Sequence, residues 1–172
     1  MMPSGPTLSG LVANLADVLD EEIALLTRRH GQLRELAGAI AARDDEPMER
    51  LLAEMEQLQQ VQAATDRRLR HARRALAACF ACDASELRLS RLIDRLSGED
   101  RGRIEWRRRR IMVLVEDVRR EHIRTAMLLT ECARVNRELM ETLFPASTPV
   151  TTYGTSGRES WRPHTGLVDT ES

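Results

Sequence analysis

Apolar residues recur every seventh position through the first forty residues of the chain. The heptad position is occupied by Val12, Leu19, Leu26, Leu33 and Ile40. It is flanked by Leu8, Leu15, Ile23 and Leu36. The spacing predicts one amphipathic helix from about Thr7 to Ala42. The segment Arg43 to Pro47 interrupts the stripe with carboxylates suited to capping and a proline suited to a first helical turn. One helix therefore ends here and another begins.

A second apolar seam extends through about Phe80. It consists of Met48, Met55, Leu69 and Leu76 at one heptad position and Leu51, Leu58, Ala72 and Cys79 at another. Gln62 and Thr65 interrupt it midway. Polar residues in a seam either fix the register of packing or are a local flaw, and the sequence leaves both interpretations open.

Two further helices are predicted. Asp83 and Ser85 can cap a short helix that Ser97 and Gly98 end. Its apolar residues are Leu87, Leu89, Leu92, Ile93 and Leu96. The longest periodic stretch follows from about Glu99 to Phe144, roughly 65 Å at 1.5 Å per residue. Its seam consists of Ile104, Ile111, Val118, Cys132 and Leu139, with Val115, Leu129 and Leu143 four residues beyond. A helix of this length projects beyond a compact bundle or needs partners.

These elements predict an all-α fold: an elongated antiparallel bundle of long, coiled-coil-like helices. Residues 1–144 form one helical domain. The segment after Phe144 is rich in Pro, Thr, Ser and Gly and too poor in apolar residues to offset the entropy of ordering. Residues 145–172 are therefore predicted to be a disordered tail.

Composition and charge agree with a helical protein that has no strong attraction to nucleic acid. The chain is 42% hydrophobic but only 3% aromatic, and its net charge is −1. Its one pronounced basic run is Arg107 to Arg110, beside Trp106. Consecutive helical residues point around the whole cylinder, and nearby acidic residues dilute the charge. A solvated face with intrahelical ion pairs is favoured over a nucleic-acid site.

The start of the chain and its cysteines indicate a cytoplasmic protein. Residues 1–6 lack a basic segment followed by an apolar one, and the longest strongly apolar run, Ile111 to Val115, is too short to span a bilayer. The 3 Cys give no disulfide framework. Cys79 and Cys82 have redox or metal spacing, but they close a helix in a chain without strands. A zinc site would need further ligands from among Cys132, His71 and His122.

We therefore expect Cys79 to be a small core residue and the cysteines to be inert. The four histidines are scattered, and the chain has no Glu-x-x-His pair and no Gly-rich phosphate loop. His122 lies on the seam of the last helix, which favours a hydrogen-bonded core histidine. No catalytic, metal-binding or cofactor-binding residue is predicted, so we expect neither an enzyme nor a bound cofactor.

The end of the last helix is strongly amphipathic. Its apolar side, with one polar residue among its members, consists of Val135, Asn136, Leu139, Met140, Leu143 and Phe144. This face either packs against the first helix or binds a helical partner in a groove or coiled coil. We predict that these six residues form a surface that binds a partner protein, because the helix extends here beyond its expected neighbours.

Two local motifs accompany this order of helices. Asn136-Arg137-Glu138-Leu139 places an Asn before a Leu-containing amphipathic turn, and Tyr153-Gly154-Thr155-Ser156-Gly157-Arg158 follows in the tail. With the long first helix, the acidic turn and the Leu-rich connector, the chain resembles the FlgN family of flagellar type III export chaperones over most of its length.

The resemblance implies a chaperone that binds the C-terminal helical segments of the hook-filament junction proteins FlgK and FlgL. It further implies delivery of these clients to the export gate protein FlhA, without nucleic acid or membrane insertion. Docking on the gate would involve Tyr153, Gly154, Gly157 and Arg158, although an incidental turn is the alternative for this motif. A generic coiled-coil adaptor or scaffold is the second interpretation of the same heptads, and a nucleic-acid-binding helical protein is the third.

Overall fold

The computed structural model describes residues 7–144, 152–153 and 159–160. In this part of the chain the elements are α1 (Leu8–Ala42), α2 (Asp45–Cys79), α3 (Leu89–Arg95), α4 (Gly98–Leu143), β1 (Thr152–Tyr153) and β2 (Glu159–Ser160). The chain divides into two compact units, residues 1–129 and 130–172. The predicted all-α bundle of long helices is confirmed.

The predicted tail lies outside the described residues except for β1 and β2. These two short strands pair antiparallel, with Thr152 opposite Ser160 and Tyr153 opposite Glu159. The sequence did not predict them, because pairs of two residues are too short to show the alternation of apolar and polar residues that marks a strand.

Both helices of the α1–α2 hairpin end in a residue with left-handed backbone. Arg43 has φ 55° and Ala81 has φ 50°. The next amide, of Asp44 or Cys82, donates to the carbonyl five residues back, at 3.1 Å and 3.0 Å respectively. This is the Schellman arrangement, which satisfies the last carbonyls of a helix and turns the chain sharply. It explains why each helix ends within about two residues of its predicted end.

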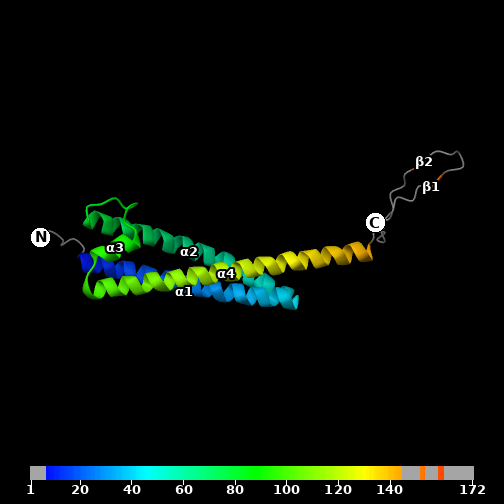
Figure 1. Cartoon of the computed structure of the whole chain (residues 1–172), viewed down its shortest axis with the longest axis horizontal. Helices are drawn as coiled ribbons and strands as arrows, with labels where there is room; N and C mark the ends of the chain where they lie inside the picture. Colours follow the sequence, from blue (N-terminus) through cyan, green and yellow to red (C-terminus); the bar gives the residue numbers. More distant parts are fainter. Residues whose placement is uncertain (1–6, 145–151, 154–158, 161–172) are drawn as a thin grey trace. The chain divides into compact units, whose positions relative to one another are not determined.

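α1 and α2 lie side by side and antiparallel (Figure 1). Gln32, late in α1, donates to Glu54, early in α2, at 3.3 Å. Glu21, early in α1, pairs with Arg68, late in α2. Their apolar seam contains Leu51, Leu58, Ala72 and Leu76 of α2, all buried as predicted. Thr65 is also buried, so the seam continues through this position and is not interrupted there.

The first part of α4 runs in the same direction as α1. Arg107, early in α4, binds Asp20 with two of its nitrogens, at 2.9 Å and 2.6 Å. Later in both helices, Gly38 and Leu128 line the same hollow of about 280 Å³. Within residues 7–129, α1 therefore has α2 on one flank and α4 on another.

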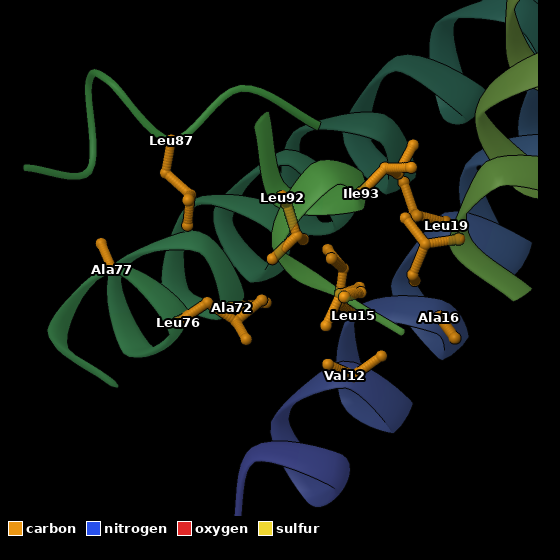
Figure 2. Packing of buried hydrophobic residues seen from close by; sticks show 12 residues of the cluster. Val12, Leu15, Ala16, Leu19, Ala72, Leu76, Ala77, Leu87, Leu92 and Ile93 are labelled. Atoms are coloured by element: carbon orange, nitrogen blue, oxygen red, sulfur yellow. The ribbon is translucent and has the colours of Figure 1, made fainter. Parts of the chain in front are cut away.

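The densest packing lies at the end of the bundle where α1 begins (Figure 2). Val12, Leu15 and Leu19 of α1 meet Leu76 of α2, and Leu92 of α3 covers them. The same cluster includes Ile104 of α4. α3 is thus a short lid that closes this end of the bundle, as a connector with a hydrophobic face should.

The predicted cap of α3 was wrong. The helix begins only at Leu89, after Arg88, which makes no side-chain capping bond. Asp83 instead accepts hydrogen bonds from the Ser85 amide and hydroxyl, each at 2.6 Å. An Asp side chain that binds the backbone two residues on stabilises a turn, and here the turn holds Leu87 against the core without extending the helix.

Candidate functional site

The residues predicted to bind clients lie on the last turns of α4. Val135 is half-buried and Asn136 is exposed. The exposed fractions of Leu139, Met140, Leu143 and Phe144 range from 47% to 68%. Side chains of this size are more often buried, and a contiguous group of them in solvent is a candidate interaction surface. The structure thus brings the predicted residues onto consecutive turns of one helix.

These residues continue a longer exposed stripe along α4. Val115, Leu129 and Leu143 share one heptad position, and all three are about half exposed or more. Met112 and Met140 each lie three residues before a member of that set, on the same face, and are exposed as well. The stripe therefore extends over about 32 residues, nearly nine turns of helix.

This stripe corrects the predicted packing of α4. The predicted seam of α4 included Val115 and Leu129, four residues beyond a heptad position that contains Ile104, but the line of residues that faces α1 lies three residues beyond Ile104. It consists of Arg107, Leu114, Glu121 and Leu128. The sequence of α4 contains two overlapping apolar seams, and only one of them packs in the bundle.

Two polar residues alternate with the apolar ones on the stripe. His122 and Asn136 occupy the heptad position of Leu129, seven residues to either side, and both are exposed. The prediction of a hydrogen-bonded core histidine at His122 was therefore wrong. Polar residues at such positions restrict which register a partner helix can adopt, since only some alignments give them polar partners.

A charged cluster lies next to the C-terminal end of the stripe. Arg134 donates to Glu131 at 2.9 Å and to Glu138 at 2.5 Å. These carboxylates raise the pKa of the Arg134 guanidinium, with the hydrogen bond to Glu131 as the larger cause. All three side chains are more than half exposed, so their contribution to stability is small.

The basic run at Arg107 to Arg110 is partly neutralised. Arg109 pairs with Glu105 one turn earlier, as the predicted intrahelical ion pairs require. Arg107 instead reaches across to Asp20 of α1, a contact that periodicity could not predict. Trp106 is exposed, and the Arg107 guanidinium lies 5.9 Å from the centre of its ring.

The burial of the two cysteines differs from what the sequence predicted for Cys79. Cys79 is exposed, so its predicted place in the core was wrong. Cys82 is half-buried and packs against the hydrophobic cluster. Within the described part of the chain, no group of three or more His, Cys, Asp or Glu residues is placed to hold a metal ion.

The predicted gate-docking residues lie in the tail. Tyr153 belongs to β1 and pairs with Glu159 of β2. Gly154, Gly157 and Arg158 lie outside the described residues. Among the described helices, none is long and apolar enough to cross a membrane.

A bundle of long amphipathic helices, with a second apolar seam in solvent, defines a protein-binding helical protein. A family model described as FlgN protein matches residues 2–160, and the chain belongs to the FlgN family. The family is one of flagellar export chaperones, whose clients are proteins of the flagellar system, and it is not a family of enzymes. No curated protein and no solved structure compared with the chain matches it.

Proposed function

We propose that this chain is a cytoplasmic chaperone for the hook-filament junction proteins FlgK and FlgL, and that it delivers them to the export gate protein FlhA. It acts by binding and release, without catalysis, cofactor or nucleic acid. The exposed apolar stripe on α4 is the observation that carries this proposal. Membership in the FlgN family supports the class of client.

The stripe gives a physical mechanism for holding a client unassembled. Helices that assemble into a filament carry apolar seams, and such seams self-associate when exposed. When an amphipathic helix of the client packs along Leu139, Leu143 and Phe144, its apolar seam is no longer exposed to water. Full burial of a large apolar side chain contributes about 1.5–3 kcal/mol. These side chains are only about half to two-thirds exposed, so roughly that share of the energy is gained on binding, before the entropy of ordering is subtracted. A few such residues are enough to hold the client, and binding remains reversible.

Asn136 provides selectivity in this arrangement. It lies on the stripe seven residues before Leu143, so a client helix must present a polar group or a water opposite it. An apolar side chain at that point would leave the amide without a hydrogen-bond partner. The cost is about 1–3 kcal/mol, enough to disfavour the wrong register.

Replacing Leu139 and Leu143 together by Asp tests the client surface. Two carboxylates on the stripe should reduce affinity for the C-terminal helical segment of a client at least about a hundredfold, because each would be buried without a partner. Titration calorimetry with the full chain gives the affinity, and circular dichroism verifies that helix content is kept.

Leu52→Asp is the matched control, since Leu52 is similarly exposed but lies on α2. It should leave client affinity unchanged. If the Leu139/Leu143 variant binds within threefold of wild type, or if the control loses affinity equally, the client surface lies elsewhere.

For gate docking, the proposal places Tyr153 in contact with the cytoplasmic domain of FlhA. An aromatic anchor at an interface can contribute about 2 kcal/mol or more. Tyr153→Ala should therefore weaken binding of the loaded chaperone to that domain at least about tenfold, with client affinity kept. Equal affinities of the wild-type and variant complexes in a titration of the gate domain would remove Tyr153 from the mechanism.

A further inference from the structure

Two hollows lie in line along the α1–α2 hairpin. One, of about 250 Å³, is lined by Asn14, Val18, Arg67, Arg68 and His71. The other, of about 300 Å³, lies between Leu25 and Arg28 of α1 and Leu58 and Val61 of α2. Their α1 residues, from Asn14 to Arg28, are spaced by three or four and share one face of the helix. Both hollows open between α1 and α2, with the Glu21–Arg68 ion pair between them, and we call the two together the groove.

This groove faces away from α4. The α1 residues that contact α4 or line a hollow with it include Asp20, Arg34 and Gly38. At 3.6 residues per turn these lie roughly 160° around α1 from the face that holds Val18 and Leu25. The groove is therefore a different surface from the exposed stripe of α4.

The floor of the groove is apolar and part of its rim is too. Val18, Leu25 and Leu58 are buried and close the groove from below. Val61 stands on the rim with 52% of its surface exposed. A partner that covers Val61 gains apolar contact without any rearrangement of the floor, because the hollow beside it is already open.

The charges around the groove favour an acidic partner. Glu21 is the one carboxylate among the lining residues of the two hollows, and it pairs with Arg68. Arg67 at one end and Arg28 at the other have no ion-pair partner within residues 7–144. Arg67 near one end of the groove and Arg28 near the other therefore provide unpaired positive charge, and the Glu21–Arg68 ion pair lies between them.

We infer that this groove binds an amphipathic helix of a partner protein, with apolar side chains over Val61 and carboxylates toward Arg67 and Arg28. The distance along α1 from Val18 to Arg28 is about 15 Å, or roughly three turns of such a helix. A helix docked between α1 and α2 completes a fourth position of the bundle. An apolar hollow between few cations suits a peptide better than a phosphate backbone, whose affinity needs many cationic contacts.

Because the groove is formed by α1 and α2 and the stripe by α4, the two surfaces share no residue, and this second partner binds whether or not a client is present. The inference thus adds a second interaction surface to the proposed function and does not depend on it. A chaperone with both surfaces can be recognised by other components of its pathway without release of its client.

A pair of synthetic peptides tests the inference on the full chain. Both are helix-forming peptides of about four turns with Leu along one face; one carries Glu at both ends and the other Lys. We expect the Glu peptide to bind at least about tenfold more tightly, and to shift the methyl resonances of Val18, Leu25 and Val61. Arg67→Glu combined with Arg28→Glu should lower its affinity about fivefold or more.

Arg91→Glu is the control, because Arg91 is exposed on α3, outside the groove. It should bind the Glu peptide as wild type does. Equal affinities for the two peptides, methyl shifts confined to α4, or displacement of the Glu peptide by a single-stranded oligonucleotide would each overturn the inference. Client affinity of the Arg28/Arg67 variant is measured in parallel. It should be unchanged, and its loss would assign the groove to the client and contradict a separate site.

Discussion

The two left-handed residues at the helix ends show how a single position sets local stability. Arg43 and Ala81 have positive φ, where a Cβ crowds the following carbonyl. Glycine has no such penalty and is common at this position of the Schellman arrangement. We predict that Arg43→Gly and Ala81→Gly each raise the free energy of unfolding by about 0.5–1 kcal/mol.

Urea unfolding followed by circular dichroism measures the effect, with Ala41→Gly as the control. Ala41 lies in the last turn of α1, so the same change there should lower stability, by at most about 0.5–1 kcal/mol. If Ala81→Gly lowers the free energy of unfolding as much as Ala41→Gly does, the backbone at Ala81 carries no strain that glycine relieves.

Heptad counting could not predict which of Cys79 and Cys82 packs against the core. Counting from Leu58 and Ala72 placed Cys79 in the seam. The helix instead ends in the turn at Ala81, and the register ends with it. The residue after a left-handed cap commonly packs back on the last turn, which is the place that Cys82 takes. The pattern of apolar residues contains no signal for that reversal.

The extents of the three long helices could be predicted well, but the start of α3 and the face that α4 buries could not. Helix ends follow from local signals, and Thr7 indeed caps α1 by accepting from the Gly10 amide at 3.2 Å. Which of the two seams of α4 packs in the bundle depends on the residues of α1 that lie opposite it. There, Asp20 provides a partner for Arg107, and Ala37 and Gly38 leave room for larger side chains of α4.

Charge complements this choice of seam. Residues 8–22 of α1 contain four acidic residues and no Arg; the acidic residues are Asp17, Asp20, Glu21 and Glu22. Opposite it, Arg68 of α2 and Arg107 of α4 provide positive charge, and Gln62 donates to Glu22 at 2.8 Å. Surface pairs of this kind contribute little energy each, but they disfavour alignments that would leave like charges together.

The heptad pattern of α4 gives the molecule two apolar seams, one that packs in the bundle and one that is exposed. The seam at Ile104 and Leu114 holds the bundle together. A second seam, which leads to Leu143, remains in solvent and carries the proposed chaperone activity. The sequence identified the client residues as a candidate surface, and they remain a prediction. The α1–α2 groove was missed, because it arises only when residues far apart in the chain come together.

Hydrogen exchange of the full chain, alone and saturated with the C-terminal helical segment of a client, tests the central claim most directly. Residues 133–144 lie on the proposed client surface. Their amides should therefore exchange at least about tenfold more slowly in the complex, while those of the α1–α2 hairpin change little. Protection that appears only along α1 and α2, or unchanged exchange at residues 133–144 in a saturated complex, would contradict the account.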